Sequence, residues 1–370
     1  MTQTNKVLVT GGGGFIGHHL VRHLKARGYW VRGVDIKQPE FEPSPADEFH
    51  LLDLRLLDNC LQATDGVTQV YALAADMGGM GYLSHHQASI LYNNATINFH
   101  TLEAARRNGV SRYLYTSSAC VYPEYRQLEA KVTPLREEDA YPAAPQDSYG
   151  WEKLVSEQLC EHYANDYGIE TRTVRFHNIF GPLGTWEGGR EKAPAAVCRK
   201  VAYAKLTGPR VVEVWGDGEQ TRSFCYIDDC VEGIYRLMQS DHRQPLNLGQ
   251  DRLISINQLV DVVAEIAGVD VVKQHIEGPQ GVRGRNSDNT RLREVLGWEP
   301  QTTLEEGLAK TYAWIEGQVR AKLAVAGRGK ASAVVRAGNL DALTDRGHGC
   351  VRHSPARGSD GTGVVPAPQR

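Results

Sequence analysis

A glycine-rich turn between an apolar run and an amphipathic helix constrains the fold of this chain most strongly. Residues 6–10 predict a short buried strand, glycines follow at positions 11, 14 and 17, and Leu20, Val21 and Leu24 then recur at helical spacing. Strand, glycine turn and helix form the arrangement in which a pyrophosphate rests on a helix N-terminus. The pattern therefore predicts that the chain begins with a dinucleotide-binding α/β unit.

The residues after this helix indicate which dinucleotide is bound. A second predicted strand, 30–35, ends in Asp35, and a third, 49–54, carries Asp53 close to its carboxyl end. An acid at the end of the second strand accepts hydrogen bonds from the adenosine ribose and repels a 2′-phosphate, so NAD is predicted rather than NADP. The expected cofactor contacts are Gly11, Gly14, Phe15, Ile16, Gly17, Asp35, Asp53, Tyr149 and Lys153.

Strands and helices continue to alternate along the first half of the chain. Predicted strands at 70–75, 113–117 and 171–176 are separated by predicted helices at about 88–108 and 149–167. Such alternation predicts an α/β fold with a Rossmann-type doubly wound parallel sheet, in which ligands collect at the carboxyl ends of the strands. Gly11, Asp35, Asp53, Gly78 and Ser118 all fall at such ends.

A candidate catalytic group follows the fifth predicted strand. Ser118 and Cys120 lie there, and Tyr149 and Lys153 form a Tyr-x-x-x-Lys pair about thirty residues later. Positions i and i+4 share one face of a helix, so the phenol and the ammonium can meet in one site. We expect the nearby cation to favour the phenolate, which would make Tyr149 a usable base. Cys120 alone is also compatible with the usual fate of a free cysteine, a small buried hydrophobe.

The second half of the chain carries arginines within glycine-rich loops, at 188–194, 215–224 and 281–286. Arginine in such loops suits a diphosphate, which it grips bidentately, although any single one is more often a solvated surface cation. We therefore expect residues 1–180 to form the NAD-binding domain and 181–319 a smaller C-terminal α/β domain that binds a nucleotide sugar, with segments that cross back. Residues 320–370 hold nine Lys or Arg against three Asp and no aromatic residue, which predicts a disordered basic tail.

The composition of the chain limits which partners and which cellular location we expect. Formal net charge is −3, no run of eighteen apolar residues occurs, and the seven cysteines are scattered without a Cys-x-x-Cys pair. We expect neither a nucleic acid nor a membrane partner and no metal site. The N-terminus leads directly into a strand and lacks the apolar region of a signal peptide, so the expected location is the cytoplasm.

Several motifs together resemble the extended short-chain dehydrogenase/reductases, the family of NAD-dependent epimerases and dehydratases. They are the glycine turn at 11–17, the Ser118/Tyr149/Lys153 set, Arg175-x-x-Asn178-x-Phe180-Gly181-Pro182, Arg222-Ser223-Phe224-x-Tyr226-Ile227-Asp228-Asp229 and Leu296-Gly297-Trp298-x-Pro300. The resemblance covers residues 6 to about 318 and leaves out the basic tail.

Within that family, segments 76–81, 117–123, 188–196 and 281–288 are most similar to members that act on GDP-mannose. This resemblance implies inversion of C3 and C5 of the sugar through a transient 4-keto intermediate, giving GDP-L-galactose and some GDP-L-gulose. It implies Cys120 as carbon base and Lys192 as the acid on the opposite face, beside Ser118, Tyr149 and Lys153. The implied substrate contacts are Gly78, Ser118, Cys120, Asn178, Lys192, Lys200, Gln220, Arg222 and Arg285, and the implied assembly is a homodimer.

Two other functions remain open at this stage. A nucleotide-sugar 4-epimerase or dehydratase would share the fold, but the dehydratases of the family place a Thr-Asp-Glu triplet where this chain has Ser118-Ala119-Cys120. A non-catalytic dinucleotide-sensing protein would keep the glycine turn and could dispense with Tyr149. The Cys120 and Lys192 pair argues against the first alternative, and the Tyr149/Lys153 pair against the second.

Overall fold

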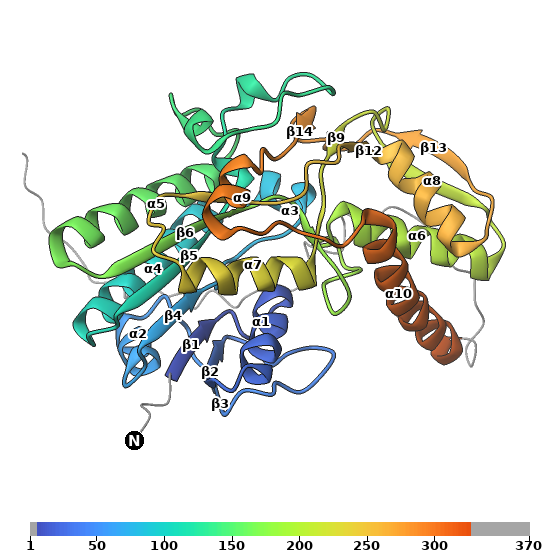
Figure 1. Ribbon diagram of the computed structural model, residues 1–370. Coiled ribbons are helices and arrows are strands. Elements are labelled where there is room, and N and C mark those ends of the chain that lie inside the picture. Colours follow the sequence, from blue (N-terminus) through green and yellow to red (C-terminus); the bar gives the residue numbers. More distant parts are fainter. Residues whose placement is uncertain (1–5, 327–370) are drawn as a thin grey trace, which may run out of the picture. The chain divides into compact units, whose positions relative to one another are not determined.

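The computed structural model describes residues 6–326 of the chain (Figure 1). Its centre is a seven-stranded sheet in the order β11-β6-β5-β4-β1-β2-β3, and every neighbouring pair in it is parallel. The strands of this sheet are β1 (Lys6–Thr10), β2 (Trp30–Asp35), β3 (Glu48–Leu51), β4 (Gln69–Ala72), β5 (Arg112–Ser118), β6 (Glu170–Phe176) and β11 (Leu246–Leu248).

Helices cover both faces of the sheet (Figure 1). On one face α1 (Phe15–Ala26) packs against α7 (Ile227–Gln239), and on the other α4 (Gln87–Arg107) packs between α2 (Leu57–Thr64) and α5 (Ser148–Tyr167). The predicted doubly wound α/β sheet is therefore confirmed, since its crossover helices shield strands whose residues are apolar on both sides.

A second layer of structure follows α5. Helices α6 (Ala193–Thr207), α8 (Ile256–Ala267) and α10 (Leu304–Ala326) pack together, and β8 (Val211–Trp215) pairs in parallel with β13 (Val272–Ile276). The remaining elements are short: α3 (Met80–His85), η1 (Ala119–Val121), η2 (Glu124–Arg126), η3 (Glu137–Ala140), β7 (Ile179–Phe180), β9 (Thr221–Arg222), β10 (Cys225–Tyr226), β12 (Ile254–Ser255), β14 (Gly284–Arg285) and α9 (Thr290–Leu296).

One hydrophobic core joins the two halves of the chain. Val7 and Val9 of β1 belong to the same buried cluster as Val201 of α6 and Ile315 of α10. In addition, β11 returns to the sheet beside β6, far from its neighbours in sequence. A strand from residues 181–319 thus lies in the sheet built by residues 1–180, as the expected crossing of segments requires. The division of the chain into those two domains stays a prediction.

Helix boundaries follow the sequence patterns closely, with local exceptions. The predicted helices at 88–108 and 149–167 correspond to α4 and α5, whereas β3 ends at Leu51, so Asp53 lies in the turn beyond it. Leu91 of α4 is 41% exposed. Helix α10 continues to Ala326, so residues 320–326 are helical and not part of a disordered tail. The predicted tail beyond them lies outside the described residues.

Two findings concern membrane-spanning helices and the state of the cysteines. In the part of the chain described, no helix combines the length and the apolar character needed to cross a bilayer. Between residues 6 and 326 the six cysteines are all free thiols: Cys60, Cys120, Cys160, Cys198, Cys225 and Cys230.

Candidate active site

The turn between β1 and α1 is built so that only glycine fits. Gly11 adopts φ +69°, and a Cβ there would lie 2.9 Å from the backbone nitrogen of Ala74. A Cβ on Gly17 would collide with the carbonyl oxygen of Gly11. Helix α1 begins at this turn with Gly14 as its N-cap, no capping side chain and no acid in its first turn. Uncapped N–H groups at the positive end of a helix fit a pyrophosphate, so these residues suit NAD.

The two predicted ribose and adenine contacts have different surroundings. Asp35 accepts hydrogen bonds from the backbone nitrogens of Gly13, Ile36 and Lys37, at 3.0, 2.7 and 3.2 Å. Burial raises the pKa of its carboxyl, and these three bonds oppose that effect. Asp53 is gripped by the guanidinium of Arg55 at 2.7–3.1 Å, and this hydrogen bonding lowers its pKa. Asp35 therefore adjoins the glycine turn directly, and Asp53 lies in the neighbouring turn.

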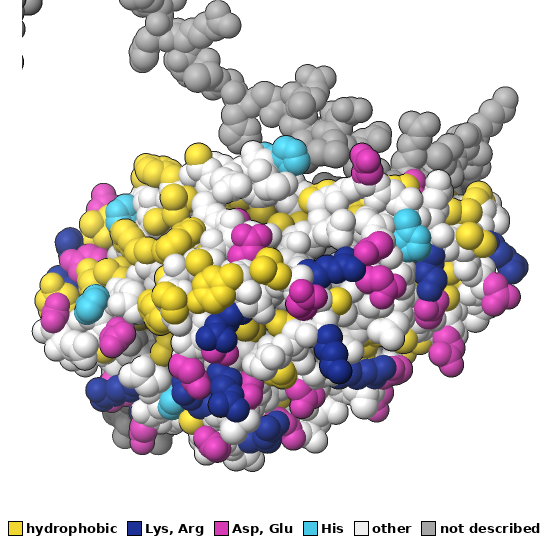
Figure 2. All heavy atoms as spheres, turned by 90° about the horizontal axis from the view of Figure 1, so that it is seen from above, with side chains coloured by type: hydrophobic (Ala, Val, Ile, Leu, Met, Phe, Trp, Pro, Cys, Tyr) yellow, Lys and Arg dark blue, Asp and Glu magenta, His cyan; other side chains and the backbone are white. Residues whose placement is uncertain are grey.

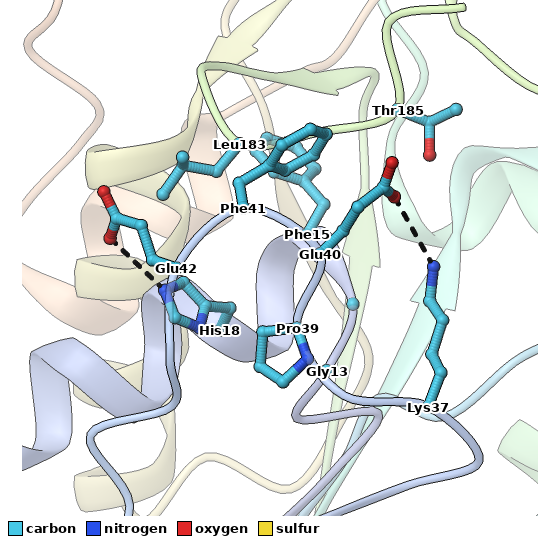
Figure 3. A pocket seen from close by; sticks show the side chains of 11 residues that line it. Gly13, Phe15, His18, Lys37, Pro39, Glu40, Phe41, Glu42, Leu183 and Thr185 are labelled. Atoms are coloured by element: carbon cyan, nitrogen blue, oxygen red, sulfur yellow. Dashed lines mark ion pairs between the residues drawn. The ribbon is translucent and has the colours of Figure 1, made fainter.

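A hollow of about 80 Å³ lies beside the glycine turn, not beside Tyr149 and Cys120 (Figure 3). Segment 37–42, which follows β2, forms one wall, with Lys37 paired to Glu40 at 4.0 Å and Glu42 to His18 at 3.6 Å. The Phe41 ring meets Trp314 of α10 edge-on, 4.9 Å between centroids. This segment thus bridges the cofactor turn and the last helix.

Ser118, Tyr149 and Lys153 come together at the carboxyl end of β5. Ser118 hydrogen-bonds Tyr149, and its hydroxyl also accepts from the backbone nitrogen of Cys120 at 3.2 Å. The Lys153 ammonium lies 5.4 Å from the centre of the Tyr149 ring and donates to the carbonyl oxygen of Thr116 at 3.0 Å. The structure therefore brings Ser118, Tyr149 and Lys153 close together, as the sequence spacing predicts.

The electrostatics at Tyr149 differ from the expectation that a nearby cation favours the phenolate. Burial raises the pKa of the Tyr149 phenol well above its ordinary value, and Cys120, Glu152 and Asp147 raise it further. The hydrogen bond with Ser118 acts in the opposite direction. The Lys153 ammonium donates its hydrogen bond to the carbonyl oxygen of Thr116 and lies over the Tyr149 ring, without a hydrogen bond to the phenol oxygen.

Cys120 lies among cations supplied by the second half of the chain. The guanidinium of Arg285 donates to its sulfur at 3.3 Å, which offers a thiolate a charge-assisted hydrogen bond. Arg285 is the register partner of Arg222 on the adjacent strand, and burial and Arg285 together lower the pKa of Arg222. Cys120 also interacts electrostatically with Arg222 and with Lys192.

Lys192 reaches this group from the N-cap position of α6. Its side chain is exposed, and desolvation by the surrounding protein lowers the pKa of its ammonium. Cys120 and Cys230 raise the pKa of Lys192, and Arg285 lowers it. A lysine that loses its proton more readily than usual is suited to proton transfer.

The glycine-rich loop after β4 is tied to the segment before Lys192. Gly79 donates its backbone N–H to the carbonyl oxygen of Arg190 at 3.1 Å, and the Arg190 guanidinium pairs with Asp76 at 3.5 Å. That guanidinium also lies 3.8 Å from the centre of the Tyr82 ring, against which a Cβ on Gly78 would press. Gly78 is thus placed where two separate chain segments meet.

The other predicted substrate contacts make hydrogen bonds to the backbone. Asn178, at φ +48°, donates to the carbonyl oxygen of Ser223 at 2.9 Å, and Lys200 donates to that of Glu213 at 2.7 Å. Gln220 donates to the carbonyl oxygen of Trp215 at 3.0 Å, while its own side-chain oxygen is buried without a partner among the described residues. Gln220 therefore offers a buried acceptor oxygen that could receive a hydrogen bond.

Sequence reasoning missed the buried carboxylate beside Lys153. Glu152 is 1% exposed and packs against α4 and β5. A signal was present, because residues 149, 152, 153, 156, 157 and 160 follow the spacing of one helix face and all are buried. Within residues 6–326, no group of three or more histidine, cysteine or acidic side chains is placed to hold a metal.

A family model described as the NAD dependent epimerase/dehydratase family matches residues 7–249. The chain belongs to this family. NAD is accordingly its cofactor, and the glycine turn described above has the geometry to receive it.

Curated relatives from plants are similar over most of the chain. "GDP-mannose 3,5-epimerase 1" of Oryza sativa subsp. japonica is 53% identical over 316 residues, which is 85% of this chain and 82% of the relative. "GDP-mannose 3,5-epimerase" of Arabidopsis thaliana is likewise 53% identical, over 85% and 83% of the two chains. "GDP-L-fucose synthase" of Escherichia coli is a more distant relative, at 29% identity over 85% and 98%.

Solved structures of epimerases share the fold. A UDP-glucose 4-epimerase of Thermotoga maritima, solved with UDP-glucose, superposes with TM-score 0.77 at 27% identity, covering 85% of this chain and 99% of that one. A UDP-glucuronic acid 4-epimerase of Bacillus cereus, in complex with UDP-glucuronic acid and NAD, gives TM-score 0.71 at 26% identity, with coverage of 85% and 99%. Both neighbours are epimerases that act on nucleotide sugars.

Proposed function

We propose that this protein is a GDP-mannose 3,5-epimerase that uses bound NAD. It converts GDP-mannose to GDP-L-galactose by inverting C3 and C5 of the sugar through a transient 4-keto intermediate, and it releases some GDP-L-gulose. The observation that carries the proposal is the interaction of Cys120 with both Tyr149 and Lys192, in a chain 53% identical to plant enzymes of that name.

In this proposal, Tyr149 and Ser118 perform the reversible oxidation. Bound NAD⁺ would supply a hydride acceptor for C4 of the sugar and a positive charge that favours the phenolate. Tyr149 takes the proton of the C4 hydroxyl, and Ser118, already hydrogen-bonded to Tyr149, steadies the same oxygen. Lys153 holds Tyr149 in place through its contact with the ring.

Cys120 and Lys192 perform the inversions. A ketone at C4 acidifies the hydrogens on C3 and C5, and the Cys120 sulfur removes one of them as a thiolate held by Arg285. Lys192, whose pKa is lowered by desolvation, returns a proton to the opposite side of the same carbon. The sequence repeats at the second carbon before the hydride returns to C4.

We assign the GDP moiety to the arginines beside Cys120. Arg222 and Arg285 lie side by side on paired strands, and two guanidiniums held close together are favoured when a diphosphate neutralises them. Gly78, Asn178, Lys200 and Gln220 complete the proposed substrate contacts. Gln220 supports this assignment best, since its buried oxygen needs a donor.

Deuterium incorporation tests the proposal. The protein is incubated with GDP-mannose in deuterated water, and the sugar is followed by NMR. Deuterium at both C3 and C5 is expected, because each inversion passes through a carbon that has lost its proton. Cys120→Ser and Lys192→Ala should each lower incorporation at both carbons about 100-fold or more while NAD remains bound.

The matched control is Lys205→Ala, a lysine on the same helix α6 that pairs with Glu316 at 3.3 Å on the surface. Its incorporation should equal that of the unaltered protein. Exchange at neither carbon, together with turnover of a UDP-sugar, would reject the proposal in favour of a 4-epimerase.

We propose further that the protein works as a homodimer formed through α4 and α5. These adjacent helices expose six large apolar side chains, namely Leu91, Tyr92, Phe99, Trp151, Val155 and Tyr167. Apolar side chains gathered on neighbouring helices are typical of a self-complementary interface.

The proposed location is the cytoplasm, where reduced thiols such as the six described here persist.

The face in Figure 2 intersperses acidic with basic side chains and groups apolar ones beside them. Such a face offers no continuous basic surface to a nucleic acid.

A further inference from the structure

Glu152 is a carboxylate buried within the fold, one residue before Lys153. It lies on the face of α5 that packs against α4 and β5, and only 1% of its surface is exposed. Burying a carboxylate is costly unless hydrogen bonds compensate, so such a residue requires an explanation. The roles described so far make no use of it.

The contacts of Glu152 are divided unequally between its two oxygens. Oε1 accepts hydrogen bonds from the amide of Asn98 on α4 and, at 3.2 Å, from the phenol of Tyr115 on β5. The Asn98 amide also lies 3.1 Å from the hydroxyl of Ser156. Oε2 is buried with no hydrogen-bond partner among residues 6–326. One oxygen therefore fixes the carboxylate, while the charge is only partly compensated.

The same face of α4 connects Glu152 to the glycine-rich loop after β4. Asn94, one turn before Asn98, is fully buried; its Oδ1 accepts from the backbone nitrogen of Asp76 at 2.6 Å and its Nδ2 donates to that residue's carbonyl oxygen at 3.0 Å. Asn94 also lowers the pKa of the Glu152 carboxyl. The network thus extends from α5 to the start of the loop that holds Gly78.

The titratable groups that face Glu152 come from two elements. Tyr115 faces it from β5 and Lys153 from α5, while α4 contributes only the neutral amides of Asn94 and Asn98. The Lys153 ammonium lies 4.9 Å from the centre of the Tyr115 ring and 5.4 Å from that of Tyr149.

The charge of Glu152 is coupled to these neighbours. Burial raises the pKa of Glu152, and Lys153 is the foremost of the groups that lower it. Glu152 in turn raises the pKa of Tyr149, alongside burial and Cys120.

We propose that Glu152 is a positioning residue for the oxidation step, whose hydrogen bonds to Asn98 of α4 and Tyr115 of β5 fix the part of α5 that carries Tyr149 and Lys153. The inference rests on the proposed function. It separates two contributions: the hydrogen bonds of Oε1 set geometry, and the carboxylate charge, which both oxygens share, acts through space on Tyr149, three residues earlier on α5.

Glu152→Gln tests the contribution of charge, because glutamine keeps the shape and one acceptor oxygen. Removing a negative neighbour lowers the pKa of Tyr149, so the phenolate forms at lower pH. The acid limb of the kcat/KM against pH profile for GDP-mannose should move down by about one pH unit. Glu161→Gln, an exposed glutamate on the same helix, is the matched control and should leave the limb in place.

Glu152→Asp tests the contribution of position and keeps the charge. Its acid limb should match that of the unaltered protein, while kcat falls about 10-fold with KM unchanged, since a shift of about 1 Å in a supporting group misplaces Tyr149. This variant also keeps the inference testable if Glu152→Gln fails to fold.

The outcomes distinguish a functional from a merely structural carboxylate. An unchanged acid limb in Glu152→Gln, or an unchanged kcat in Glu152→Asp, would overturn the inference, whatever happens to the melting temperature. Failure of the proposed function is a separate result, because the unaltered protein would then show no turnover of GDP-mannose.

Discussion

At the scale of single residues, the cofactor turn depends on two backbone segments that approach without side chains between them. The carbonyl oxygen of Gly11 occupies the space that a Cβ of residue 17 would need. Because Gly17 lies in the first turns of α1 and is buried, neither segment can retreat without moving the helix. The glycine at this position is thus a packing requirement as well as a feature of the motif.

Gly17→Ala should therefore disturb both stability and cofactor binding. We expect a loss of about 1–3 kcal/mol in the free energy of unfolding, since the added methyl group overpacks the turn. NAD affinity should fall as well, because the N-terminus of α1 shifts. Urea unfolding and titration with NAD measure the two effects.

Gly317→Ala is the matched control for that substitution. Gly317 lies exposed within α10, with nothing near its Cβ position, so alanine there should raise the free energy of unfolding by about 0.5–1 kcal/mol. Equal stability of the Gly17 variant and the unaltered protein would show that the turn can relax.

At the scale of elements, helix α4 is braced against α5 by one carboxylate. Glu103 accepts hydrogen bonds from Arg106 at 2.8 Å, from Arg107 at 2.6 Å and from the Tyr163 phenol of α5 at 3.1 Å. Hydrogen bonding by Arg106, the largest cause, lowers the pKa of Glu103 to about 2. This bracing holds together the two helices that carry Asn98 and Glu152.

Glu103→Gln should destabilise the protein by about 0.5–1 kcal/mol near pH 7, a value suited to a partly exposed ion pair. The pKa of this carboxyl is lower in the folded than in the unfolded protein, so the carboxylate stabilises the fold at pH values above the unfolded pKa. That contribution to the free energy of unfolding disappears as the pH falls through the folded pKa. The difference between variant and unaltered protein should thus shrink from about pH 4.5 toward about pH 2. Melting temperatures at several pH values measure it, with the exposed Glu294→Gln on α9 as control. A difference that does not vary with pH would contradict the assignment.

Elements with long periodic patterns could be predicted from the sequence, and short ones could not. Helices α4 and α5 begin and end within one residue of the expected positions. Strands β9, β12 and β14 have only two residues each, too few for any periodicity, and their pairing depends on loops distant in sequence. Glu152 escaped notice for a related reason, since its partner Asn98 lies on another helix.

The residues of the candidate site likewise fall into a group that could be predicted from the sequence and a group that could not. Ser118, Tyr149 and Lys153 could be brought together from a strand end and a helix spacing alone. The hydrogen bond from Arg285 to Cys120 could not, because it joins residues 165 positions apart. Nor could the burial that raises the pKa of Tyr149, which depends on the packing of the whole site.

At the scale of the whole molecule, the exposed apolar side chains of α4 and α5 form the proposed dimer interface. Trp151 is 43% exposed and lies two residues after Tyr149 on the same helix. A partner docked there would therefore rest directly on the helix that bears the proposed base.

Trp151→Glu should convert the proposed dimer to a monomer, because a charge at the centre of an apolar contact is costly to bury. Sedimentation should give twice the chain mass of 40.9 kDa for the unaltered protein and the single mass for the variant. Val272→Glu, at an exposed valine of β13, is the control and should remain dimeric. A monomeric unaltered protein would rule out the interface.

The return of β11 to the central sheet has a consequence for how the chain is made. The edge of β6 that β11 covers stays open while roughly seventy further residues leave the ribosome, and closing so long a loop carries an entropic cost. An uncovered parallel edge is a template for pairing with other chains. Asn247, which binds Tyr122 and His177 from within β11, arrives only at that moment. Until β11 has been made, the nascent sheet therefore has an open edge at β6, and this is the stage at which pairing with another chain is most favoured.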